Sequence, residues 1–142
     1  MTTFTLDIET LIPHRDRMKL ISDVLEINAE AAVTSSLVTD RWPLCRGRFV
    51  DPIVLIEIVA QTSGVYINWL DGVQIGTSGR GWLVGIKSAD FFLDRIPLHT
   101  VLITTVKKLY GSDNYNALEG VVTAGSDIVG RVQIQVFKSE SG

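Results

Sequence analysis

The hydrophobic pattern is densest between residues 51 and 70, DPIVLIEIVAQTSGVYINWL, where apolar side chains occupy nearly every side of a helix. Such a segment predicts one long helix buried inside a domain. Asp51 is a good N-cap residue, and Pro52 fits the first helical position, where its missing N–H costs nothing. The polar residues recur at i, i+4, i+7 and i+11, a spacing that gathers them on one narrow stripe: Glu57, Gln61, Gly64 and Asn68.

One carboxylate, Glu57, lies in this apolar helix. A buried carboxylate is costly unless it is paired or used, and two interpretations follow. In the first, Glu57 is a structural residue satisfied by neighbouring backbone or by an arginine. In the second, Glu57 lines a pocket and takes part in proton transfer.

The rest of the chain is mostly strand-like. A short helix is expected at 5–11 and strands at 18–27, 31–39, 82–93, 100–110, 115–124 and 128–138, with a turn at 28–30, an irregular stretch at 40–50, a glycine-rich loop at 72–81 and turns at 94–99 and 125–127. In the last strand Ile128, Val132, Ile134 and Val136 alternate with Arg131, Gln133 and Gln135, which predicts a sheet with one wet face. The order predicts an α+β fold, a single domain over 1–142 whose antiparallel sheet wraps around the long helix.

Composition narrows the functional classes. The chain has 142 residues, 46% hydrophobic and 20% charged, which is typical of one globular domain. A net charge of −3 and a pI near 5.3 argue against a dedicated nucleic-acid binder. A single cysteine, Cys45, cannot form an internal disulfide, and two histidines offer no metal-ligand spacing. No signal peptide is visible, and the polar stripe disfavours a membrane span, so a cytoplasmic protein is expected.

Three segments resemble the FabZ-type 3-hydroxyacyl-ACP dehydratases. PHRDRMKLISDVLEI (13–27) resembles their N-terminal PHR segment, and VLIEIVAQTSGVYI (54–67) resembles their helix motif L-I-E-x-x-A-Q-x-x-G. LVGIKSADFFLDRIPLHTVL (83–102) is similar to their F-V-G-I strand pair. The matches occur in the same order as in the family, and the nearest branch is the FabZ-like dehydratases of aryl-polyene pathways.

The resemblance implies a hot-dog fold with acyl tunnels at a dimer interface. The implied assembly is a homodimer, a higher hot-dog oligomer, or a hetero-oligomer with another hot-dog chain. The family removes water from a 3-hydroxyacyl chain on acyl carrier protein, giving a trans-2-enoyl thioester. It uses a histidine base and a helix carboxylate, and no cofactor besides the carrier's phosphopantetheine. Glu57 occupies the position of the helix carboxylate, and Gly85 lies in the strand motif expected to bind substrate.

Two family features are missing. Residues 47–50 read GRFV where the family has G-H-F-P, so Arg48 replaces the catalytic histidine, and an arginine cannot act as a general base at neutral pH. Pro52 replaces the helix-start glycine and has no N–H to polarise a thioester carbonyl. The N–H of Ile53 is the candidate substitute, and Ile53 and Arg48 are therefore expected to bind substrate.

His14, in the PHR segment, is the candidate replacement base. The alternative is a histidine that braces the N-terminal turn locally.

His99 is expected to be exposed in a turn, and Cys45 to be a plain small residue. Gln61 is expected to hydrogen-bond Glu57 one helical turn away and to line the substrate site, and the alternative is a satisfied amide of the core. Five basic residues are candidates for a basic rim that docks an acidic carrier protein, and the alternative is ordinary surface charge: Arg46, Arg48, Arg80, Lys87 and Arg95.

Three functions remain open. The first is a 3-hydroxyacyl-ACP dehydratase that uses Glu57 with His14. The second is a hot-dog thioesterase, in which Glu57, with Gln61 or Thr62, acts as nucleophile or activates water without a histidine. The third is a non-catalytic subunit that binds acyl carrier protein and has lost the base.

Overall fold

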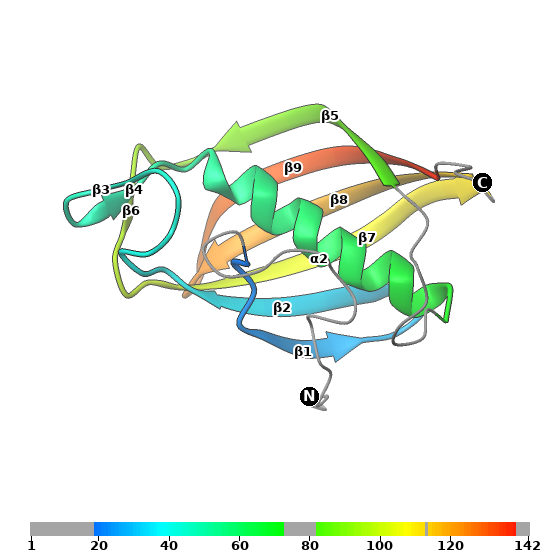
Figure 1. Ribbon diagram of the computed structural model, residues 1–142, viewed down its shortest axis with the longest axis horizontal. Helices are drawn as coiled ribbons and strands as arrows, with labels where there is room; N and C mark the ends of the chain where they lie inside the picture. Colours follow the sequence, from blue (N-terminus) through cyan, green and yellow to red (C-terminus); the bar gives the residue numbers. More distant parts are fainter. Residues whose placement is uncertain (1–18, 73–81, 113, 139–142) are drawn as a thin grey trace.

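The computed structural model describes residues 19–72, 82–112 and 114–138 (Figure 1). The elements follow the chain as β1 (Asp23–Ile27), β2 (Ala31–Leu37), β3 (Cys45–Arg46), β4 (Phe49–Val50), α2 (Val54–Leu70), β5 (Trp82–Phe91), β6 (Ile96–Pro97), β7 (Val101–Ser112), β8 (Tyr115–Ala124) and β9 (Asp127–Lys138). Within these residues no helix is long and apolar enough to cross a membrane.

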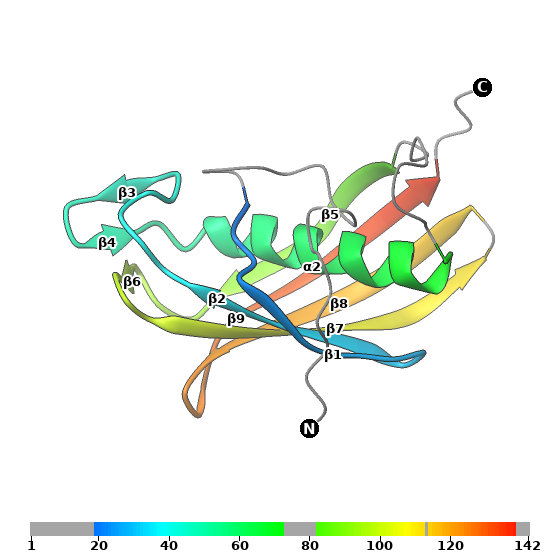
Figure 2. The same cartoon turned by 60° about the horizontal axis from the view of Figure 1, so that its bottom comes forward.

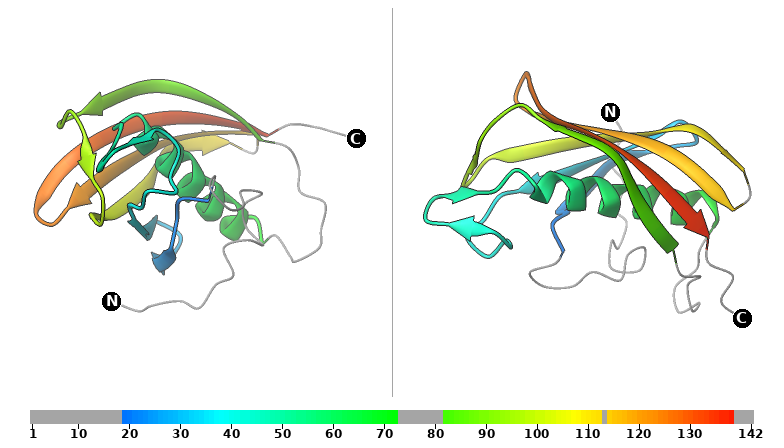
Figure 3. Two further views of the ribbon diagram at one scale, coloured as in Figure 1. Left: turned by 60° about the vertical axis from the view of Figure 1, so that its left-hand side comes forward. Right: turned by 90° about the horizontal axis from the view of Figure 1, so that it is seen from above.

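An antiparallel sheet of six strands, in the order β1-β2-β7-β8-β9-β5, curls around the single described helix α2 (Figures 1 and 2). A smaller sheet, β3-β4-β6, lies beyond the N-terminal end of α2. The helix covers the concave face of the large sheet, and the convex face carries no other described element (Figure 3). This is the predicted α+β arrangement.

The core forms between α2 and the concave face. Leu55 of α2 lies over Gly130 of β9, and Val59 lies over Gly120 of β8. Farther along, the hydroxyls of Thr62 and Thr34 of β2 are 2.9 Å apart. The helix therefore crosses the sheet diagonally from β9 toward β2.

Tyr66 fixes the C-terminal half of the helix. Its ring is fully buried, and its hydroxyl donates a hydrogen bond to the carbonyl oxygen of Ala29, in the β1–β2 turn, at 2.7 Å. Burial raises the pKa of Tyr66, and the negative charge of Glu30 raises it further. The predicted 28–30 turn is present and is held by the Asn28 side-chain oxygen, which accepts from the N–H groups of Glu30 and Ala31.

The predicted alternation in the last strand is confirmed with one exception. Val132, Ile134 and Val136 are buried, while Arg131 on the other face is exposed. Ile128 was expected with the buried set but is 44% exposed. The register between β8 and β9 shifts at Val122/Thr123, next to the partner of Ile128, so the alternation is interrupted there.

Several predicted boundaries were wrong. The first strand begins at residue 23 rather than 18, and α2 begins at 54 rather than 52. The irregular stretch 40–50 contains β3 and β4, and the turn 94–99 contains β6. Strands of two residues are too short to give a periodic signal, so sequence pattern does not detect them. The predicted helix at 5–11 and most of the 72–81 loop lie outside the described residues.

Candidate active site

The N-terminal end of α2 is built differently from the prediction. The helix N-cap is Ile53, and Asp51 lies two residues before it. The Asp51 carboxylate accepts a hydrogen bond from the backbone N–H of Ile53 at 2.9 Å. Asp51 therefore caps the turn that leads into the helix. The Ile53 N–H, the candidate donor to a thioester carbonyl, is engaged with Asp51 in this structure.

The predicted polar stripe lies on the face of α2 that points away from the sheet. Leu55 and Val59 contact the sheet, and the residues two positions farther on, Glu57 and Gln61, lie about 200° around the helix axis from them. Glu57 is half-buried, and Gln61 is fully buried. A buried polar face on a helix is typical of a functional site or of a hydrogen-bond network in which every polar group has a partner.

Glu57 and Gln61 form the hydrogen bond that the sequence predicted. The Gln61 amide nitrogen donates to Glu57 Oε1 at 3.2 Å, and the Gln61 amide oxygen accepts from the backbone N–H of Leu20 at 2.9 Å. Because only the amide oxygen accepts a hydrogen bond, the Leu20 N–H fixes which way the amide points. Gln61 therefore holds one Glu57 oxygen in a defined position, anchored to the segment before β1.

His14 lies outside the described residues, so its proposed pairing with Glu57 stays a prediction. The described chain begins at Lys19, and Leu20 reaches the Glu57–Gln61 face of α2 through its backbone. Leu20 and Ile21 are each 2% exposed. The segment that follows the PHR motif thus lies on the same side of the helix as the candidate carboxylate.

Arg48 lies in the small sheet, in the turn between β3 and β4, and is exposed. Its carbonyl oxygen accepts from the N–H of Leu98 at 2.9 Å, which ties this turn to the residues after β6. Beside it the guanidinium of Arg95 lies 4.1 Å from the centre of the Phe49 ring. The small sheet thus presents arginine side chains at the helix N-terminal end of the molecule. Lys87 of the predicted rim lies instead on β5 of the large sheet, and the rim stays a prediction. Arg80 of that rim lies outside the described residues.

Gly85, predicted to bind substrate, lies on the convex side of the edge strand β5. It pairs in register with Gln135, whereas its neighbours Val84 and Ile86 pair with the inward residues of β9. A side chain at Gly85 would meet only the Gln135 amide, at 3.9 Å. Gly85 therefore reaches the helix side through its backbone alone.

His99 and Cys45 are the two weaker candidates for a catalytic residue. His99 is exposed, as predicted, and has a positive φ of 71°, a conformation uncommon outside glycine. Cys45 is half-buried, and its sulfur donates to the carbonyl oxygen of Gly47 at 3.6 Å. Neither residue is positioned against Glu57 by a described contact.

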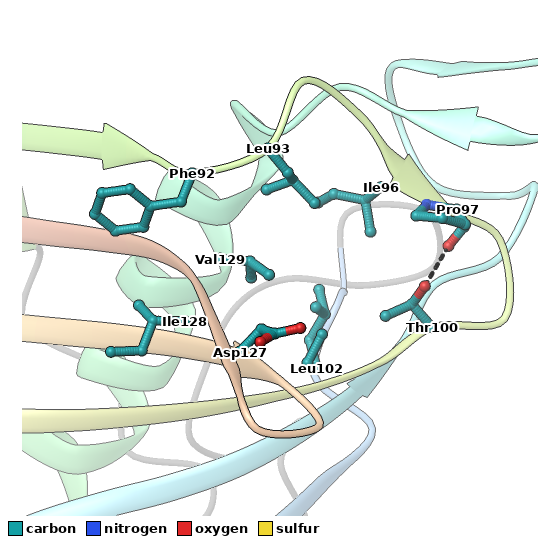
Figure 4. A pocket seen from close by; sticks show the side chains of 10 residues that line it. Phe92, Leu93, Ile96, Pro97, Thr100, Leu102, Asp127, Ile128 and Val129 are labelled. Carbon is teal, nitrogen blue, oxygen red and sulfur yellow. Dashed lines mark hydrogen bonds between the residues drawn. The ribbon is translucent and has the colours of Figure 1, made fainter.

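An apolar pocket of about 550 Å³, which the sequence did not indicate, opens at one end of the sheet (Figure 4). It is lined by Phe92, Leu93, Ile96, Pro97, Thr100, Leu102, Ala124, Asp127, Ile128 and Val129. The Thr100 hydroxyl donates a hydrogen bond to the Pro97 carbonyl oxygen at 2.7 Å, so its proton is already used within the pocket wall. The lining comes from the β5–β6 and β8–β9 connections and the start of β7, and no local sequence signal links segments so far apart. Glu57 is not among its lining residues.

Comparison with known proteins identifies the family and the fold. A family model described as ApeP-like, ApeP dehydratase, matches residues 6–141. The ApeI:P dehydratase heterocomplex from Xenorhabdus doucetiae superposes with a TM-score of 0.81 at 14% identity, covering 97% of this chain and 94% of that one. No curated protein matched the sequence.

Other solved structures share the fold at similarly low identity. A hypothetical thioesterase with coenzyme A from Streptococcus pneumoniae gives a TM-score of 0.66 at 14% identity, covering 82% of this chain and 84% of that one. The E. coli PaaI protein from the phenylacetic acid degradation operon gives 0.63 at 13% identity, covering 82% and 78%. At these identities the likeness concerns the fold alone, and it confirms the predicted hot-dog fold.

Proposed function

The chain belongs to the ApeP-like dehydratase family, and on this premise we propose that it takes part in removing water from a 3-hydroxyacyl thioester on acyl carrier protein. The product is the trans-2-enoyl thioester. The observation that carries the proposal is Glu57, a half-buried carboxylate oriented by Gln61 on the face of α2 opposite the sheet. A carboxylate held by a buried amide is suited to proton transfer because its geometry is fixed before substrate binds.

The chemistry requires one base and one acid. The base takes the proton from C2 of the substrate, the electron pair forms the C2–C3 double bond, and the C3–O bond breaks. The hydroxyl leaves as water with a proton from the acid. We assign the acid role to Glu57 and the base role to His14, since Arg48 cannot accept the proton.

The edge strand β5 supports assembly with a second hot-dog chain. Val84 and Ile86 pair with the buried β9 residues Val136 and Ile134, so they lie on the concave face, yet they are 46% and 48% exposed. The described helix therefore leaves this apolar edge uncovered. An exposed, apolar edge strand is a template for pairing with another chain.

The basic small sheet supports docking of an acidic carrier protein. Arg46 and Arg48 are exposed there, close to the start of α2. We expect Arg46→Glu with Arg48→Glu to raise the KM for carrier-bound substrate about tenfold, because charge reversal repels an acidic partner. The kcat is expected to stay within about twofold. Steady-state kinetics at low salt test this.

The control for docking is Lys108→Glu, an exposed charge reversal on β7 away from the small sheet. A short pantetheine thioester, which lacks the carrier's acidic surface, should show no change in KM with the double variant. An equal rise in KM for both substrates would mean that the arginines act on the thioester arm and not on the carrier.

A second candidate function is a non-catalytic subunit. Arg48 in place of the family's histidine favours it, and the name of the similar Xenorhabdus structure describes a heterocomplex. In this case the chain would complete the assembly while the second hot-dog chain supplied the reacting groups.

Dehydration of a short 3-hydroxyacyl thioester on carrier protein, followed by mass spectrometry, distinguishes the candidates. The chain is assayed alone and together with a second hot-dog dehydratase chain. Turnover that requires Glu57, in either assay, supports the dehydratase. Turnover only with the second chain, insensitive to Glu57, supports the non-catalytic subunit. Release of free carrier thiol without enoyl product would overturn both in favour of thioester hydrolysis.

A further inference from the structure

The small sheet has one apolar face and one basic face. Strand pairing places three apolar residues in one row, where they pack against the core: Cys45 of β3, Val50 of β4 and Ile96 of β6. Because successive side chains of a strand point to opposite faces, the next row points outward. This row places Arg46 directly beside Phe49, and Phe49 beside Pro97. The small sheet lies beyond the N-terminal end of α2, the end that carries Glu57 (Figure 2).

Arg95 is held against the aromatic ring of this outward face. Its guanidinium carbon lies 4.1 Å from the centre of the Phe49 ring, a cation–π contact. Such a contact holds the planar guanidinium in place but uses none of its N–H donors on an acceptor oxygen. Arg95 is exposed, whereas Phe49 is half-buried. Arg95 therefore presents its fork of donors to solvent from a fixed position.

Two more arginines come from the β3–β4 hairpin. The turn of this hairpin consists of Gly47, with a φ of 62°, and Arg48. Arg46 is the cross-strand partner of Phe49, which brings their Cβ atoms to about 5 Å from each other. Arg46 and Arg95 thus lie next to the same ring. Within the part of the chain that the structure describes, the side chains of Arg46, Arg48 and Arg95 pair with no carboxylate.

Two carboxylates lie close to this face. Asp51 follows Phe49 by two residues, and its carboxylate accepts a hydrogen bond from the Ile53 N–H at 2.9 Å, so it is turned toward the start of the helix. Asp94 precedes Arg95 and is exposed. Three arginines and two carboxylates give this surface a net positive charge, although the whole chain carries −3. A positive surface on an acidic chain is suited to an anionic ligand.

We propose that Arg46, Arg48 and Arg95 bind a phosphate ester on the outward face of the small sheet. Guanidinium groups bind phosphate oxygens in bidentate fashion, and a phosphate ester has enough oxygens for more than one of them. The substrate of the proposed reaction carries one such group, the phosphate that joins the pantetheine arm to the carrier protein. On this point the inference rests on the proposed function. A phosphate held here lies at the end of α2 that carries Glu57, where the thioester has to react.

Binding of non-reactive thioethers tests the site without any turnover. S-butyl phosphopantetheine and S-butyl pantetheine differ only in the phosphate, and isothermal titration calorimetry measures both, for the chain alone and with a second hot-dog chain. We expect the phosphorylated form to bind about tenfold more tightly. Arg95→Gln is expected to reduce this ratio to about twofold. Lys108→Gln, the loss of an exposed positive charge on β7, is the matched control and is expected to leave the ratio unchanged.

Three further variants test the geometry of the site. Arg95→Lys keeps the charge but loses the fork, so its ratio is expected to lie between those of wild type and Arg95→Gln. Phe49→Leu removes the ring that holds Arg95, and the ratio is expected to fall to about threefold. Asp51→Asn removes a nearby negative charge but keeps a capping side chain, and is expected to raise the ratio about twofold. Urea unfolding of each variant separates a lost contact from a lost fold.

Three results would overturn the proposal. The first is equal affinity of wild type for the two thioethers, or no binding of the phosphorylated one, and the second is an unchanged ratio in Arg95→Gln. The third is displacement of S-butyl phosphopantetheine by an equal concentration of inorganic phosphate, which would mean that the arginines bind any phosphate and not the arm. A chain that binds the phosphorylated thioether but forms no enoyl product would keep this site and lose the proposed reaction, so the two failures are distinguishable.

Discussion

Glu57→Gln is expected to lower the rate of enoyl thioester formation by about a hundredfold or more, whether the chain is assayed alone or with a second hot-dog subunit. A positioned acid or base contributes on the order of 10²- to 10⁴-fold to a proton-transfer step, and an amide can neither give nor take that proton. The loss should fall on kcat, because the substitution keeps the size and polarity of the side chain. Single-turnover dehydration followed by mass spectrometry measures it.

The variant is expected to fold normally. The Gln61 amide nitrogen donates to Glu57 Oε1, and the introduced amide still offers a carbonyl oxygen at that place. The change in the free energy of unfolding should therefore stay below about 1 kcal/mol. Glu30→Gln is the matched control, since Glu30 is exposed in the β1–β2 turn and should leave the rate unchanged. Full activity in a folded Glu57→Gln variant would return Glu57 to the structural interpretation.

The parts of the site predicted from sequence are those that depend on local periodicity. The Glu57–Gln61 contact follows from i, i+4 spacing on one helix, and the buried face of β9 follows from alternation at Val132, Ile134 and Val136. Both patterns depend only on the regular geometry of one helix or one strand, which fixes the side chains that share a face.

What could not be predicted depends on contacts between distant segments. Alternation specifies the face of a strand but not its neighbours, so it did not show that β5 would be an edge strand with Val84 and Ile86 uncovered. The Leu20 N–H that orients Gln61 is a backbone group, which every non-proline residue carries, and it gives no sequence signal.

Gly120→Ala is expected to lower the free energy of unfolding by about 2 to 3 kcal/mol, a large effect for one methyl group. A Cβ at Gly120 would lie 2.5 Å from Val59 Cγ1 and 2.6 Å from Val59 Cγ2, closer than real Cβ atoms approach other atoms. Val59 is fully buried, and a valine has one preferred rotamer in a helix, so its methyl groups cannot turn away. Urea denaturation measures the loss.

Gly130→Ala is the matched control for this position. Its added Cβ would lie 2.6 Å from Leu55 Cδ1, the far end of a flexible side chain that can rotate away. The cost at Gly130 is therefore expected to be about 1 kcal/mol or less. Equal losses at the two glycines would mean that the helix as a whole shifts to accept either methyl group. Val59 would then not fix the distance between α2 and β8.

A double-mutant cycle decides whether the Val59–Gly120 contact fixes the helix on the sheet. Val59→Ala alone should cost about 2 kcal/mol through lost burial. The double variant should cost no more than Val59→Ala alone, because the new methyl group occupies the space that the valine leaves. The coupling energy is then about 2 to 3 kcal/mol, the full cost of Gly120→Ala. Additive losses would contradict this. Since Glu57 lies two residues from Val59 on the same helix, strong coupling would also mean that a glycine in β8 sets the position of the candidate catalytic carboxylate.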